Sequence, residues 1–244
     1  MLTTLRKTRI YIRITMTYEE TVALLRASAD PTFREGMTRF GIAVDRALGV
    51  HVPAIRRLAK QAGCDHSLAM QLFASGIHEA QIMASMVADR QQFRPEDMDA
   101  WVADFDSWDV CDQCCMNLFR YVPYARSKVR EYAAAEREFT RRAAFALLAT
   151  LAVGDKRAEN SVFTDFLPLV EEYSHDVRPS IRKAVNWALR QIGKRNDVLR
   201  LQALEVAQRI AASPVAAERW TGRDALRELT DPKVIARVQA KTIF

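Results

Sequence analysis

Glycine and proline are scarce in this sequence, with eight of each among 244 residues. Both residues mark the turns of β-hairpins, so their scarcity argues against a fold built from many short strands. Alanine, leucine, arginine and glutamate, which all favour helices, are abundant. Hydrophobic residues make up 49% of the chain, which is enough to bury a sizeable core. The composition therefore predicts an all-α protein.

Long apolar runs are also missing. No segment approaches the roughly 18 apolar residues that are needed to cross a bilayer, and no secretory signal precedes a small-residue cleavage site. Three of the four cysteines, Cys111, Cys114 and Cys115, lie within five residues, and only Cys64 lies elsewhere. This spacing does not suit a disulfide framework, so we expect a soluble protein of the reducing cytoplasm.

The cysteine cluster lacks a second ligand pair for a metal. Zinc sites usually combine two such pairs, and none of the four histidines supplies an obvious partner. We therefore expect structural cysteines on a helix, and a metal site is the alternative.

Charge is distributed unevenly along the chain. The formal net charge of +6 divides into +4 for residues 1–15, −6 for residues 16–119 and +8 for residues 120–244. A basic half suits a surface that binds phosphates, because each neutralised phosphate releases counterions. An ordinary solvated basic face explains the same charge equally well.

The first fifteen residues are too short to pack a core. We interpret residues 1–15 as a disordered basic arm or a non-native start, and the alternative is a DNA-contacting tail or a targeting segment. Thr17 and Glu20 have the spacing of a capping box, so the fold is expected to begin near Met16. No long polar linker follows, and residues 16–244 are expected to form one domain and a monomer.

Helical periodicity continues almost to the end of the chain, in segments of roughly 12–20 residues. The second half also resembles itself: residues 140–145 align with 181–186 at a shift of 41, and residues 186–190 align with 223–227 at a shift of 37. Periods near 40 are typical of HEAT and armadillo repeats. The sequence therefore predicts a single curved α-solenoid, although chance similarity among alanine-rich helices is an alternative.

Trp187 lies outside the apolar stripe of the helix expected from Pro179 to about Gly193. That stripe comprises Ile181, Ala184, Val185, Ala188 and Ile192. Trp187 instead projects among three basic residues, Lys183, Arg190 and Lys194. An indole among cations suggests a ligand surface for a base or a sugar, and the alternative is packing against the next repeat.

Two arginines precede the apolar stripe of the helix expected over residues 137–152. Arg142 lies almost opposite this stripe, so we expect it to be free to reach a phosphate. Arg141 lies nearer the stripe, where it can cap or snorkel at the edge.

Trp108 and Asp112 lie one turn apart on a helix expected to open near Ser107. Their face continues through Cys115 and Phe119 and is otherwise apolar. A carboxylate on an apolar face must be paired, reach solvent or take part in chemistry, because burying it bare is costly. A salt bridge to an arginine of a neighbouring repeat and a chemical role are equal alternatives for Asp112.

The other acidic and histidine residues are weaker candidates. Asp104, Asp106 and Asp109 are expected to cap or solvate this helix. His78 and Glu79 lack the second histidine of a zincin helix, so we expect hydrogen bonds between helices there.

These motifs together resemble the DNA alkylation repair glycosylases of the AlkD type, which are built from HEAT-like repeats. The likeness extends over most of residues 16–230. Its distinctive segments are Ser107–Asp112, Arg141–Ala144 and Arg182–Arg190.

The resemblance implies roles for individual residues. Trp108, Asp112 and Trp187 would surround the damaged nucleotide as the catalytic residues. The DNA backbone would be held by basic residues, namely Arg142, Arg141, Lys183, Arg190 and Lys194. The implied activity is hydrolysis of the N-glycosidic bond of cationic N3- or N7-alkylated purines in double-stranded DNA, without base flipping or a cofactor.

Two other functions remain open. Some branches of this family bind DNA without excising a base, so a non-catalytic protein that recognises damaged or branched DNA is the main alternative. A scaffold for protein interactions, with an incidental basic half, is the third.

Overall fold

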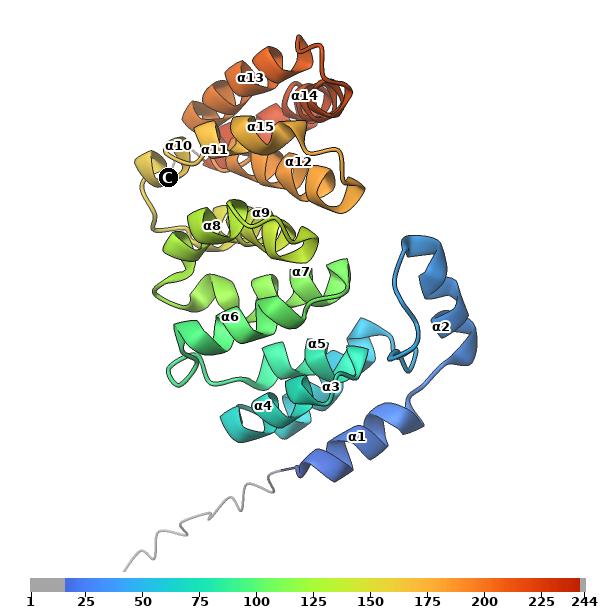
Figure 1. The fold of residues 1–244 in the computed structure, drawn as a ribbon. Coiled ribbons are helices and arrows are strands. Elements are labelled where there is room, and N and C mark those ends of the chain that lie inside the picture. Colours follow the sequence, from blue (N-terminus) through green and yellow to red (C-terminus); the bar gives the residue numbers. More distant parts are fainter. Residues whose placement is uncertain (1–15, 242–244) are drawn as a thin grey trace, which may run out of the picture.

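The computed structural model describes residues 16–241, and these form a stack of helices that contains no strand (Figure 1). The predicted all-α solenoid is confirmed. The interpretation of residues 1–15 lies outside the described residues. Thr17 caps the first helix through the predicted box, since its hydroxyl accepts from the Glu20 N–H and the Glu20 carboxylate accepts from the Thr17 N–H.

Six helices form an inner row in which each contacts the next. They are α3 (Val52–Ala62), α5 (His78–Val87), α7 (Trp108–Asn117), α9 (Glu138–Gly154), α12 (Pro179–Gly193) and α14 (Ala216–Leu229). The outer layer consists of α4 (His66–Ala74), α6 (Pro95–Asp104), α8 (Ala125–Ala133), α10 (Asn160–Thr164), α11 (Leu167–Glu172) and α13 (Asp197–Ala211). Two short 3₁₀ turns, η2 (Phe119–Tyr121) and η3 (Tyr173–His175), connect elements of the stack.

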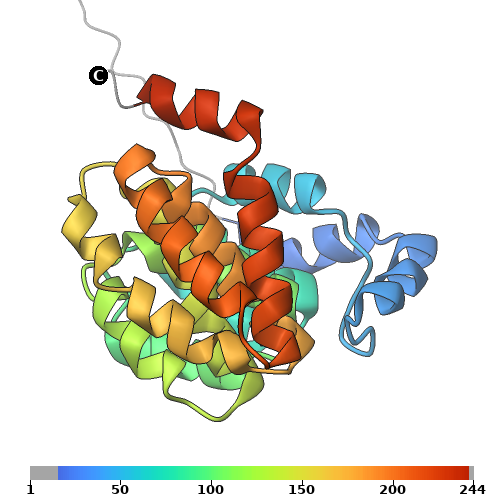
Figure 2. The ribbon, with the colours of Figure 1, turned by 90° about the horizontal axis from the view of Figure 1, so that it is seen from above.

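The remaining elements flank the stack. These are α1 (Tyr18–Ala27), α2 (Pro31–Met37), the 3₁₀ turn η1 (Thr38–Phe40) and α15 (Pro232–Lys241). Figures 1 and 2 both show α2 standing off to one side of the stack. We call residues 31–47, which include α2 and η1, the N-terminal arm.

The repeat is clearest between α12 and α14. The amide of Asn186 donates to Asp224 at 2.8 Å, and the Arg190 guanidinium donates to Glu228 at 2.5 Å, with a separation of 38 residues in each pair. The two helices therefore run parallel and in register. These contacts pair side chains across the interface, so their separation does not test the alignment at a shift of 37, which stays a prediction.

Helices in the first half are shorter than predicted. Helices α3 to α8 have 9 to 11 residues, whereas α9, α12, α13 and α14 have 14 to 17. Gly63 stops α3 and Gly76 separates α4 from α5, both at a positive φ of about 70° that other residues avoid. Such early stops make these helices shorter than the expected range of roughly 12–20 residues.

Helix α9 is buried on every side. Every residue from Arg142 to Ala152 is buried, because α7, α8 and α12 all pack against this helix. A helix in such a position has no polar face. A helical wheel that assumes one buried side therefore wrongly predicts that the residues opposite the apolar stripe are exposed.

Candidate active site

A cleft of about 340 Å³ lies between α7, α9 and α12 on the inner row. Eight residues line it: Trp108, Asp109, Asp112, Gln113, Met116, Arg142, Lys183 and Trp187. The structure thus brings together the three predicted catalytic residues, together with two of the five predicted DNA-binding cations. Gln113 and Met116 were not predicted as site residues, although they follow Asp112 on the same helix.

Helix α7 presents Trp108 and Asp112 to the cleft because it begins after Ser107, as predicted. The Trp108 indole is fixed from the opposite side, since its Nε1 donates to the Phe40 carbonyl at 3.0 Å. The ring also packs against a small apolar cluster of the N-terminal arm that includes Met37 and Ile42. No pattern in the sequence had linked this arm to the cleft.

The Asp112 carboxylate forms a bidentate ion pair with Arg142. Nε of Arg142 donates to Oδ1 of Asp112 at 3.0 Å, and Nη2 donates to Oδ2 at 2.7 Å. A third donor, Nη1, reaches the Ser180 carbonyl at 2.5 Å. The salt bridge considered for Asp112 is therefore confirmed, and it lies inside the cleft.

Arg142 is only 6% exposed, so the prediction of a side chain free to reach a phosphate was wrong. Burial favours the neutral form of each partner, and it raises the pKa of Asp112 even though Arg142 acts in the opposite direction. Burial also disfavours the charge on Arg142, but Asp112 outweighs it and the pKa of Arg142 is raised. We conclude that the arginine stays charged and holds both carboxylate oxygens.

Trp187 both lines the cleft and packs against the main hydrophobic core. Packing, one of the two alternatives for this residue, is therefore confirmed, while a ligand surface stays a prediction. The core stripe predicted on α12 is confirmed, because all five of its residues are fully buried. Lys183 is exposed at the cleft, one turn before Trp187.

The family model for DNA alkylation repair enzymes matches residues 21–229, which include every residue of the cleft. The chain belongs to this family. The match confirms the resemblance inferred from the sequence. No curated protein matches the chain.

A solved structure described as a new family related to the HEAT-like repeat DNA glycosylases, with affinity for branched DNA structures, shares this fold. Its TM-score is 0.74, over 87% of this chain and 95% of its own, at 19% sequence identity. At that identity, the likeness shows the fold of this DNA alkylation repair family member and not its reaction.

Asp109, the second carboxylate in the cleft of this family member, is held by His78. The His78 Nε2 lies 2.8 Å from Asp109 Oδ2, and Ser107 also donates its hydroxyl to Asp109. Burial disfavours the imidazolium, but Asp109 outweighs it and raises the pKa of His78. The pair joins α5 to α7, which confirms the hydrogen bonds between helices expected at His78.

Glu79 is buried beside His78 and ties α5 to the segment that precedes α3. Its carboxylate accepts hydrogen bonds of 2.7 to 3.1 Å from three successive backbone N–H groups, those of Leu48, Gly49 and Val50. Such donors satisfy a buried carboxylate without a cation. Glu79 therefore has a structural role in this family member, as expected.

Three predicted DNA-binding cations are engaged between helices and do not line the cleft. Arg141 donates to Asp176 at 2.8 Å and to the Ala133 carbonyl at 3.0 Å, so it caps the end of α8, as one alternative held. Arg190 and Lys194 both pair with Glu228 on α14. With two acids and two bases, the cleft of this family member is balanced in charge, whereas the sequence had suggested a cation-lined groove.

The cysteine cluster lies on the buried side of α7. Cys111 and Cys115 direct their thiols at the carbonyls of Phe139 and Ala143 on α9, at 3.9 and 3.7 Å, and Cys114 is fully buried beside them. Burial raises the pKa of Cys114 and of Cys115. The expected structural role is confirmed.

Residues 16–241 contain no cluster of three or more histidine, cysteine, aspartate or glutamate residues that could hold a metal ion. None of their helices is both long and apolar enough to cross a bilayer.

Proposed function

We propose that this protein is a DNA glycosylase that hydrolyses the N-glycosidic bond of cationic N3- or N7-alkylated purines in duplex DNA. The observation that carries the proposal is the common cleft of Trp108, Asp112 and Trp187. Family membership gives the general class, DNA alkylation repair. The chemistry of the cleft supports the specific reaction.

The two indole rings suit a substrate that carries positive charge. An alkylated purine is cationic before the reaction, and the deoxyribose becomes an oxocarbenium-like cation as the bond breaks. Each aromatic face near a cation contributes about 0.5–2 kcal/mol. Trp108 and Trp187 would therefore attract both the lesion and the transition state.

Asp112 supplies the negative charge that the developing sugar cation requires. The bond to the base breaks with its electron pair going to the base nitrogen, so the cationic purine leaves as a neutral base. Water then adds to C1′ and loses one proton to the carboxylate or to solvent. A fixed carboxylate stabilises such a transition state electrostatically, as in glycoside hydrolysis.

Arg142 has a different role from the one implied by the resemblance. Because it holds both oxygens of Asp112, it would orient the carboxylate rather than bind a phosphate. Lys183, exposed at the cleft, would contact the DNA backbone instead. As the resemblance implies, the lesion would remain in the duplex while the bond breaks.

Release of 7-methylguanine from a duplex tests the proposal. Wild type should release the free base, and Asp112→Asn should lose at least about tenfold in rate, since one positioned charge contributes more than about 1.4 kcal/mol to a transition state. Asp106→Asn is the matched control, because this exposed carboxylate precedes the same helix and does not line the cleft. Normal release by Asp112→Asn would refute the assigned role.

A non-catalytic function is the second candidate, and one contact favours it. Both Asp112 oxygens are already occupied by Arg142, as in a purely structural ion pair. The solved structure with this fold is described as having affinity for branched DNA. Tight DNA binding by folded wild type without release of any cationic base would establish this alternative.

A further inference from the structure

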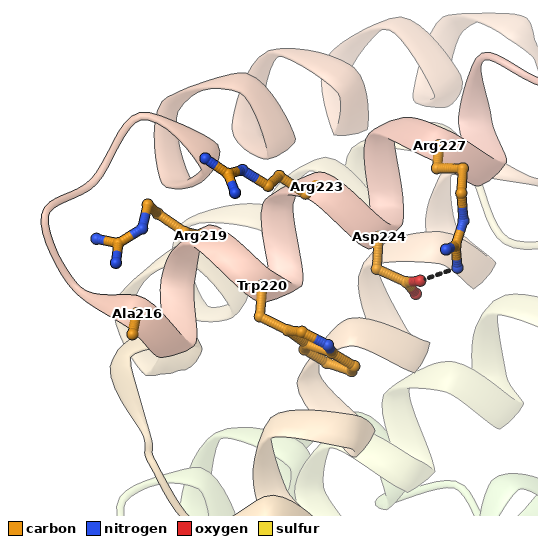
Figure 3. Close-up of a pocket in the computed structure, with 6 residues that line it drawn as sticks. All are labelled: Ala216, Arg219, Trp220, Arg223, Asp224 and Arg227. Atoms are coloured by element: carbon orange, nitrogen blue, oxygen red, sulfur yellow. Dashed lines mark hydrogen bonds and ion pairs between the residues drawn. The ribbon is translucent and has the colours of Figure 1, made fainter.

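A second groove, of about 470 Å³, lies on α14 outside the cleft. Figure 3 shows its lining: Ala216, Arg219, Trp220, Arg223, Asp224 and Arg227. The three arginines are spaced four residues apart, so they follow one side of the helix over two turns. The groove thus carries three cations and one acid.

Trp220 is 38% exposed within this groove, although burial usually stabilises an indole. The Arg182 guanidinium lies 4.5 Å from the centre of its ring. Nε of Arg182 is buried and has no hydrogen-bond partner among the described residues. The arginine thus lies over the ring, and the exposed part of the indole lines the groove.

Arg223 is the most available cation of the groove. It is exposed, and no hydrogen bond or ion pair to its side chain is found within residues 16–241. Arg219 donates to the carbonyls of Ser213 and Pro214, and Arg227 pairs with Asp224. Both of these arginines therefore have partners within the protein, whereas the Arg223 guanidinium is available to bind an anion.

The groove and the cleft are adjacent through α12. Arg182 lies over Trp220, and the next residue, Lys183, lines the cleft. A strand that passes Lys183 can therefore continue past Arg182 and Trp220 towards Arg223. We therefore expect the groove to bind the same nucleic acid as the cleft.

We propose that the α14 groove binds an unpaired nucleic-acid strand that continues from the duplex in the cleft. An indole next to a row of cations is the arrangement that holds single strands, with a base stacked on the ring and phosphates on the arginines. Bases within a duplex are already stacked and cannot cover Trp220. The partner is therefore DNA with a single-stranded tail or branch, and in naming this partner the inference rests on the proposed function.

Fluorescence anisotropy with two lesion-free probes tests the groove: a blunt duplex, and the same duplex with a single-stranded tail of about ten nucleotides. Wild type should bind the tailed probe at least about fivefold more tightly. Trp220→Ala should abolish this advantage and leave blunt-duplex affinity and 7-methylguanine release from a blunt duplex unchanged. Because the probes carry no lesion, the result does not depend on catalysis.

Further variants keep the result clear if Trp220→Ala folds poorly. Trp220→Phe retains an aromatic face and should keep most of the advantage, whereas Arg223→Glu should lose it. Arg157→Ala is the matched control, since this exposed arginine lies in the loop after α9. That loop contacts Arg195, which follows the C-terminal end of α12, whereas Arg182 lies near the N-terminal end. Folding is checked by thermal melting.

Two outcomes would overturn the proposal. One is an unchanged preference for the tailed probe in both folded Trp220→Ala and Arg223→Glu. The other is an equal loss of affinity for the blunt and tailed probes, which would mean that the groove contacts duplex DNA only. Normal base release by Asp112→Asn, or no release by wild type, with the tail preference intact would contradict the proposed function and leave the groove proposal standing on its own.

Discussion

The Arg142–Asp112 pair joins α7 to α9 and also lines the candidate active site. Arg142 is buried and the Asp112 side chain is only 15% exposed, so each depends on the other to compensate for the water it has lost. The same carboxylate lines the cleft together with Trp108 and Trp187. Single substitutions at this pair are therefore expected to affect folding as well as base release.

Arg142→Ala should lower the free energy of unfolding by about 3 kcal/mol, because it leaves the Asp112 carboxylate buried without a counter-charge. Urea denaturation measures this loss. The double variant with Asp112→Asn should recover part of it, so the two substitutions should couple by more than about 1 kcal/mol. Strictly additive losses would mean that the ion pair contributes little.

Individual helices are joined by charges as well as by apolar faces. Asp176, which precedes α12, accepts from Arg141 on α9 at 2.8 Å and from Arg178 at 2.6 Å. Burial opposes ionisation of Asp176, yet these two arginines lower its pKa to about 2. The carboxylate thus links two neighbouring repeats.

Acid should weaken this link. The pKa of Asp176 is lower in the folded chain than in the unfolded chain, so its contribution to stability is present above about pH 4 and is lost as the pH falls towards 2. Full protonation should cost about 2 kcal/mol. Chemical denaturation at several pH values should show a steeper decline for wild type than for Asp176→Asn. Parallel declines between pH 4 and 2 would contradict this assignment.

Across the whole molecule, some basic side chains are paired with acids and others are exposed, and the net charge of each segment does not distinguish the two groups. Many cations of the basic half are paired between repeats, as Arg141, Arg190 and Lys194 are. Lys183 and Arg223 are exposed on the inner row. We therefore expect DNA affinity to depend on few residues rather than on the net charge of +6.

DNA affinity should fall as salt rises, with a slope of about 0.9 in the logarithm for each phosphate neutralised. Replacing Lys183 by alanine should reduce the slope measured on duplex DNA by about one phosphate. Titrations between 50 and 200 mM salt, about the range over which such slopes are usually compared, provide the measurement. Replacing Lys194 the same way is the matched comparison, because Glu228 already holds it. Equal changes in the two variants would disprove the distinction between paired and exposed cations.

Several features of the fold and site were readable from the sequence because they depend on local spacing. Trp108 and Asp112 share a face since a helix turns once in about four residues, and Thr17 and Glu20 form their box for a similar reason. Trp220 was missed, although it follows Arg182 at the register that joins Asn186 to Asp224. The repeat itself was the signal that could have found it.

The sequence by itself determined the helical class, the repeat and the face shared by Trp108 and Asp112, because periodicity and capping act over a few residues. Only the tertiary structure decided that Arg142 points inward to Asp112 and that Phe40 anchors Trp108. Those contacts join residues 30 and 68 positions apart. They depend on how many neighbours cover each helix, and no wheel drawn for one helix contains that information.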